Sequence, residues 1–97
     1  MTQSELIQVL AELNALLTRT GFPDRAAWIH DREGILLDPD ATDDGREFAR
    51  SELHSIVSGM GGLLDLRLVP DASLKLSARE ARERLDGLAD RLYELTR

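Results

Sequence analysis

The 97-residue sequence contains no cysteine, and aromatic residues make up only 4% of it. Without cysteine there can be no disulfide framework and no thiolate metal site, which fits a reducing compartment, so we expect a cytoplasmic protein. No run of about 18 apolar residues is present to span a membrane, and the first residues lack the pattern of a secretory signal. With so few aromatics, the core must be built from leucine and alanine, which favours helices.

Positive charge is also scarce, since the net charge is -6. Phosphate backbones are bound mainly by clustered lysine and arginine, so we expect no nucleic-acid partner, and no membrane partner either. Residues 1–65 carry 12 acidic and 5 basic side chains, whereas residues 66–97 carry 6 and 7. The middle of the chain holds eight carboxylates, Asp24, Asp31, Glu33, Asp38, Asp40, Asp43, Asp44 and Glu47. Such a run is typical of a solvated loop, and its functional alternative is a face for a basic protein.

Apolar residues recur at spacings of three and four in four segments, about 3–19, 23–32, 45–57 and 77–96. This periodicity predicts a mainly α fold of four helices in a single domain, residues 1–97. Gly21 is placed to end the first helix in a left-handed turn, and Pro23 suits the start of the second. We expect Gly34 to end the second helix and Asp44 to cap the third.

Residues 58–70 begin as a Gly-rich turn, with Gly59, Gly61 and Gly62 within four residues, and continue as a short extended segment. Leucines alternate with polar residues from 64 to 68, which indicates a half-buried strand. Residues 35–37 are the candidate second strand of a two-stranded pair; otherwise 64–68 is an extended loop that presses leucines into the core. We predict that Asp65 accepts hydrogen bonds from the backbone of the turn and that Met60 fills the core.

Two patterns in the chain imitate ligand sites. The order Asp40, Thr42, Asp44, Gly45 follows the start of an EF-hand, but its twelfth position is Ser51 instead of glutamate. The Gly-rich turn follows a helix and contains no basic residue, whereas phosphate cradles precede a helix. We therefore expect no metal and no cofactor.

Histidine and serine lie one helical turn apart in the third helix, at His54, Ser51 and Ser58. A hydroxyl and an imidazole are the minimum for a nucleophile and its base, but no orienting acid is identified. We therefore expect no catalytic residues. Trp28, the sole tryptophan, is predicted to be a core residue, with a partner anchor as the alternative.

The last helix carries the longest regular seam, formed by Ala81, Leu85, Leu88, Leu92 and Leu95. A capping box at Ser77 and Glu80 precedes it. A seam of two heptads is too short for an independent coiled coil, so we expect it to pack on the first helix. Tyr93 lies beside the seam, and leftover apolar surface there would support a homodimer.

The window Ser58-Gly59-Met60-Gly61-Gly62-Leu63-Leu64-Asp65-Leu66 resembles a Gly-Gly-Met-Gly-Ser-(Leu/Phe)-Asn-Asp-Leu signature. That signature occurs in a group of short, uncharacterised bacterial proteins. The positions that match are Gly59, Met60, Gly61, Leu63, Asp65 and Leu66. Ser58, Gly62 and Leu64 depart from it, and the helix after Pro70 is not covered. The resemblance implies a small, mostly helical bacterial domain without known chemistry, so it carries no catalytic residues to this chain.

These observations favour a small acidic protein-binding module that neutralises a basic toxin or effector, as immunity proteins and antitoxins do. The candidate partner-binding residues are Asp38, Asp40, Asp43, Asp44 and Glu47, because complementary charge accelerates and orients association. The alternative is a self-associating structural or accessory subunit, a homodimer through the C-terminal helix. An enzyme is disfavoured, because no nucleophile, base and oxyanion donors are found together.

Overall fold

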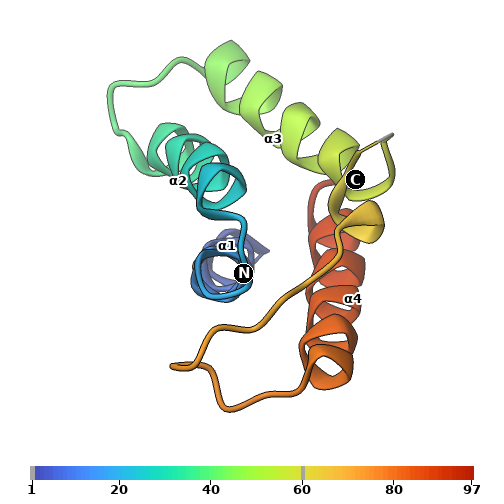
Figure 1. Cartoon of the computed structure of the whole chain (residues 1–97). Coiled ribbons are helices and arrows are strands. Elements are labelled where there is room, and N and C mark those ends of the chain that lie inside the picture. The colour runs from blue at the N-terminus through green and yellow to red at the C-terminus, as the bar shows by residue number, and fades with distance from the viewer. Residues whose placement is uncertain (1, 60) are drawn as a thin grey trace.

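The computed structural model describes residues 2–59 and 61–97 and is mainly α (Figure 1). Its elements in chain order are α1 (Thr2–Thr18), α2 (Pro23–Leu37), α3 (Asp43–Ser58), the 3-10 turn η1 (Leu63–Asp65) and α4 (Ala78–Leu95). The predicted four-helix content is confirmed, and no β-strand occurs among the described residues. No helix in these two ranges is long and apolar enough to cross a membrane. The prediction for Met60 lies outside the described residues.

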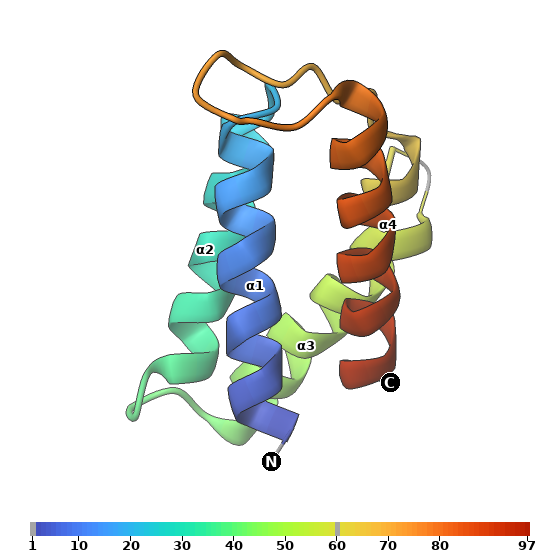
Figure 2. The same ribbon diagram turned by 90° about the horizontal axis from the view of Figure 1, so that it is seen from below.

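The four helices surround a core made almost entirely of leucine and alanine. α1 packs against both α2 and α4, whereas α3 bridges α2 and α4 and its backbone does not come close to that of α1 (Figures 1 and 2). Leu6, Leu10, Leu13 and Leu17 of α1 are fully buried, as expected for one stripe with spacings of four and three. α3 thus leaves much of its surface uncovered.

Local signals set three of the helix ends as predicted. Gly21 has a φ of 94°, and the N–H of Phe22 donates to the carbonyl of Leu17 at 3.0 Å, which closes α1. Pro23 begins α2. Before α4, the Ser77 hydroxyl accepts from the N–H of Glu80 at 3.1 Å, while the Glu80 carboxylate accepts from the N–H of Ser77 at 2.9 Å. The hydrogen bond from the backbone N–H of Ser77 lowers the pKa of Glu80 in the folded protein. The capping box therefore stabilises the fold while Glu80 is ionised, and this stabilisation is lost as the pH falls through the lowered pKa.

Two predicted helix ends are wrong. α2 continues through Gly34 to Leu37, because the stripe that buries Ile29 buries Leu36 two turns later. Residues 35–37 are therefore helical and cannot form the second strand of the predicted pair. α3 is capped by Thr42, whose hydroxyl accepts from the N–H of Gly45 at 2.9 Å, and Asp44 lies inside its first turn.

The extended segment after η1 pairs with the end of α1. The N–H of Val69 donates to the carbonyl of Thr20 at 3.2 Å, and the N–H of Asp71 donates to that of Arg19 at 2.8 Å. These bonds satisfy carbonyls that the end of α1 leaves free. Leu66 and Leu68 are buried, so the alternative of a loop that presses leucines into the core describes this segment.

Arg82 of α4 fastens the same segment to the helix. Its guanidinium donates to the carbonyls of Leu66 and Leu64, each at 2.8 Å, and forms an ion pair with Asp86 at 2.8 Å. Arg82 therefore stabilises a stretch of chain that has no regular backbone pairing of its own.

We expect Arg82→Ala to lower the free energy of unfolding by about 1–3 kcal/mol, because one partly buried and one exposed carbonyl lose their charged donor. Urea denaturation followed by circular dichroism measures this loss. Arg79→Ala is the matched control, since Arg79 forms only an exposed pair with Glu83 at 3.4 Å and should change stability by less than about 0.5 kcal/mol. Equal losses for the two variants would contradict a fastening role for Arg82.

The leucine seam of α4 is buried within the single chain. Ala81, Leu85, Leu88 and Leu92 have little or no exposed surface, and Leu95 packs partly buried against the core. The last helix packs on α1, as the sequence predicts, and also on α3. The seam is therefore covered within one chain, whereas Tyr93 beside it is 39% exposed.

Candidate functional site

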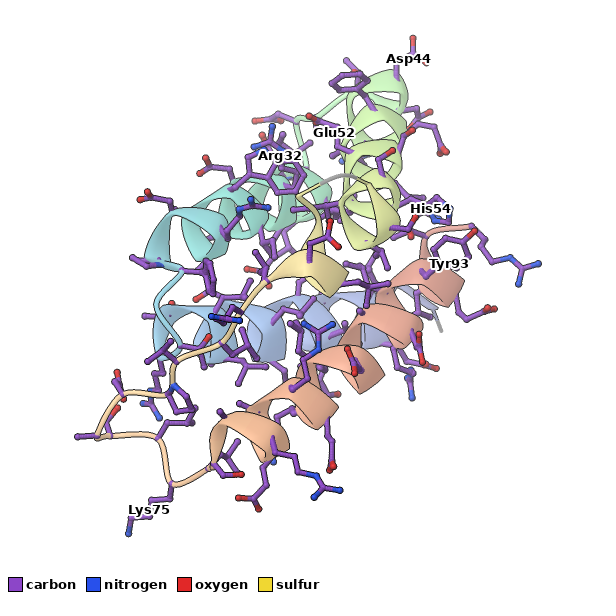
Figure 3. All side chains as sticks on the ribbon, turned by 45° about the vertical axis from the view of Figure 1, so that its right-hand side comes forward. Arg32, Asp44, Glu52, His54, Lys75 and Tyr93 are labelled. Carbon is purple, nitrogen blue, oxygen red and sulfur yellow. The ribbon has the colours of Figure 1, made fainter. Side chains whose placement is uncertain are left out.

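The predicted partner-binding residues lie in the α2–α3 loop and the first turns of α3, and we call Asp38, Asp40, Asp43, Asp44 and Glu47 the acidic segment. Asp38 has a structural role, because its carboxylate accepts from the N–H of Asp40 at 2.9 Å and its carbonyl accepts from Arg46 at 2.6 Å. Asp43 forms an exposed ion pair with Arg46 at 3.6 Å. Figure 3 shows Asp44 at the outer end of α3.

The acidic segment keeps a strong excess of negative charge. Arg46 is the sole basic residue between positions 38 and 47, against five carboxylates. The side chains of Asp40, Asp44 and Glu47 are exposed, and none takes part in an ion pair within residues 2–59 and 61–97. Asp43 and Asp44 in the first turn of α3 also interact favourably with the helix dipole, so part of this negative charge stabilises the fold.

Beside the acidic segment, α2 and α3 enclose an open groove of about 760 Å³. Its apolar wall comes from Trp28, Phe48 and Ile56, and its polar wall from Ser51, Ser55 and Glu52. Asp24, Arg25, Gly59, Gly61 and Gly62 close one end. The groove thus has an apolar wall, and its lining also includes the carboxylates of Asp24 and Glu52.

Two stripes of side chains, one on α2 and one on α3, contribute Asp24, Trp28, Phe48, Ser51 and Ser55 to the lining of this groove. On α2, Asp24, Trp28, Asp31 and Ile35 follow one another at spacings of four, three and four, which places them on one face. On α3, Asp44, Phe48, Ser51 and Ser55 have the same spacings. We call these sets the α2 stripe and the α3 stripe. Each stripe presents an aromatic residue one turn after an aspartate.

A cation holds Trp28 in place. The guanidinium of Arg32 lies 4.0 Å from the centre of the Trp28 ring and forms an ion pair with Glu52 of α3 at 3.1 Å. Figure 3 shows Arg32 and Glu52 between the two helices. The positive charge of Arg32 is therefore neutralised inside the protein, and the tryptophan ring is fixed against α2.

The closed end of the groove is formed by the glycines after α3. Arg25 donates to the carbonyl of Gly61, and the N–H of Gly61 donates to the carboxylate of Asp65 at 2.9 Å. Gly61 has a φ of 73°, a left-handed conformation that favours glycine. Gly62 is buried and its N–H donates to the carbonyl of Gly59 at 2.8 Å. These bonds attach the start of α2 to the end of α3.

Neither aromatic residue of the groove is a fully buried core residue. Trp28 is half-buried, packing against the core on one side and lining the groove on the other. Phe48, an apolar residue of the segment predicted to be helical over 45–57, is 68% exposed. The buried stripe of α3 consists of Ala49, Leu53 and Val57 at spacings of four. Phe48 lies one residue before that stripe, and this offset is the sequence signal for its exposure.

His54 and Ser51 of α3 have different surroundings. The His54 ring contacts Tyr93 of α4 at a centroid distance of 4.2 Å, and its Nδ1 lies 3.0 Å from the hydroxyl of Thr96 (Figure 3). Because that hydroxyl donates its hydrogen to the carbonyl of Leu92 at 2.6 Å, it accepts a hydrogen bond from the Nδ1–H of His54. His54 thus joins α3 to the end of α4, while Ser51 lines the groove.

No group of three or more acidic or histidine side chains is positioned to hold a metal ion in the part of the chain that the structure describes. Comparison with protein-family models, with curated proteins and with solved structures finds no match to this chain.

Proposed function

We propose that this protein is a non-catalytic binding module that captures a basic protein partner through the acidic segment and the adjoining groove. Neutralisation of a toxin or effector, as by an immunity protein or antitoxin, is the role that this arrangement supports best. The observation that carries the proposal is Phe48, a large aromatic residue that is 68% exposed among the carboxylates of α3. Exposed aromatics that border charged surface are typical of interfaces.

The packing of α3 supports the same proposal. The N-terminal half of α3 extends beyond the rest of the bundle and is covered on only one side, by α2 (Figure 1). It carries Asp43, Asp44, Glu47 and Phe48, none of which packs into the core. A protein surface that combines an uncovered helix with uncompensated charge is suited to rapid, oriented association with an opposite charge.

The buried seam of α4 weighs against the homodimer alternative. Self-association through Leu85, Leu88 and Leu92 would require the core to open, because these side chains are already buried within one chain. Among the described residues, the most exposed large hydrophobic side chain is Phe48, which lines the groove and does not belong to the seam. A binding module for a different protein is therefore the better supported function.

Affinity capture from the native host, followed by mass spectrometry, tests the proposal. We expect a stoichiometric basic partner to bind the natural protein and to be lost with the triple variant Asp40→Lys, Asp43→Lys, Asp44→Lys. Neutralising the same residues to Asn should lower the association rate by about tenfold or more and reduce its salt dependence, because rim charges act mainly on association.

The matched control is Glu12→Lys, Glu83→Lys, Asp90→Lys, which changes three exposed carboxylates on α1 and α4. Each triple adds six positive units to a net charge of -6, so both variants are neutral. The partner should remain bound to the control variant. Loss of the partner from both variants, or from neither, would contradict a binding site at the acidic segment.

A further inference from the structure

We infer that the groove between α2 and α3 receives an amphipathic α-helix of the partner, with apolar residues on one stripe and lysine or arginine on both flanks. This inference rests on the proposed function and specifies the partner's binding element. The occupant would lie along the groove between the two stripes, contacting Trp28 and Phe48 with its apolar side chains. Its cationic flanks would face the aspartates of the margins.

The shape of the site favours a helix over an extended peptide. The groove is bordered by two helices, and no β-strand lies among residues 2–59 and 61–97 to offer an unpaired edge. An extended peptide would leave its backbone N–H and C=O groups without partners against the apolar wall, whereas a helix satisfies its own. The α2 stripe from Asp24 to Ile35 is about 17 Å long, enough for three turns of a partner helix.

The side chains that line the groove indicate which side chains the partner helix carries. Trp28, Phe48 and Ile56 form the apolar wall, and the guanidinium of Arg32 lies over the Trp28 ring at 4.0 Å from its centre. The exposed carboxylate of Asp24 lines the groove, and those of Asp31 and Asp44 lie one helical turn from the lining residues Trp28 and Phe48, on the same helix faces. None of these three forms an ion pair within the described chain, whereas both nearby arginines, Arg25 and Arg32, are bound internally.

A second copy of this chain is a poor occupant of the groove. The protein has a net charge of -6, so docking another copy against the acidic margins would bring like charges together. A basic helix instead neutralises the margins while it covers the exposed aromatics. The charge of the site and its apolar wall thus point to the same partner class.

Trp28 provides a direct test, because it is the sole tryptophan and lines the groove. The probe is a synthetic helix of about 18 residues, ~27 Å long, with leucine on one stripe and lysine on both flanks. We expect saturable binding with a blue shift of the Trp28 emission. A peptide of the same composition with its leucines dispersed around the helix, and one with glutamate in place of lysine, should bind at least tenfold more weakly.

Two single variants of the protein locate the binding. Phe48→Ala should lower the affinity for the probe about tenfold, because it removes one of the two aromatic side chains that the probe contacts. Val69→Ala removes a residue of similar exposure, 67%, in the loop between η1 and α4, and should leave binding unchanged. Circular dichroism confirms that both variants are folded. Absence of a saturable shift, equal binding of the dispersed peptide, or equal effects of the two variants would overturn the inference.

Native partner capture separates this inference from the proposed function. If the partner requires the acidic segment but binds Phe48→Ala normally, the helix-in-groove inference fails and the proposed function stands. If the synthetic helix binds through Phe48 while charge reversal of the acidic segment leaves capture intact, the proposed function fails instead. A concentration-dependent dimer that Phe48→Ala abolishes would assign the groove to a second copy and overturn the inference.

Discussion

Gly62→Ala is expected to lower the free energy of unfolding by about 3 kcal/mol or more. A Cβ atom at this position would lie 2.2 Å from the carbonyl oxygen of Ile56 and 2.7 Å from that of Gly59. Both obstacles are backbone atoms, which cannot move aside as a flexible side chain does. The φ of Gly62 is -78°, which any residue adopts, so the requirement for glycine is one of space alone.

Thermal denaturation measures this effect, and a domain of this size should lose roughly 12–24 °C of melting temperature. Gly87→Ala is the matched control, because no atom lies within 4 Å of the added Cβ in the middle of α4. Alanine there should raise stability by about 0.5–1 kcal/mol through its better helix propensity. A Gly62→Ala protein that melts like the natural one would contradict the close approach of residue 62 to the end of α3.

Leu63→Ala is the second large expected loss, about 2–5 kcal/mol, because it leaves a cavity where a fully buried side chain was. Leu64→Ala should cost less than about 1 kcal/mol, since Leu64 is 43% exposed. Urea denaturation with an unchanged m-value distinguishes the two costs.

The two variants distinguish η1 from a strand, because the alternating pattern of residues 64–68 predicts the larger loss of stability for Leu64→Ala. A strand that buries Leu66 and Leu68 would bury Leu64 as well, and would leave Leu63 on the opposite face. The 3-10 turn at Leu63–Asp65 changes this phase, so Leu63 enters the core and Leu64 does not. A larger loss for Leu64→Ala than for Leu63→Ala would contradict η1 and support the strand.

The candidate site was only partly readable from the sequence. The acidic segment could be located, because charge density is a property of neighbouring residues. The groove could not, since Trp28 and Phe48 are twenty positions apart in the chain and lie on one groove only because α2 and α3 pack as a hairpin. The pairing of Arg32 with Glu52, which orients Trp28, depends on the same packing.

The sequence by itself determined the helical class and those helix ends that depend on a few adjacent residues. Gly21, Pro23 and the Ser77–Glu80 capping box act within one turn of chain, so their effects are visible without knowledge of the fold. The leucine stripes of α1 and α4 are likewise local, because helical spacing alone aligns them.

Where local signals compete with burial, only the tertiary structure decided which residues are helical and which are buried. Gly34 permits a helix end but does not impose one, and burial of Leu36 beyond it carries α2 to Leu37. Between α3 and α4, Leu63 is buried and Leu64 exposed because η1 packs against those two helices, a contact that no alternation of residues encodes. Helix propensity and capping act over a few residues, whereas burial is a property of the whole packed chain. At these positions the free energy gained by burial is larger than that of the local signals.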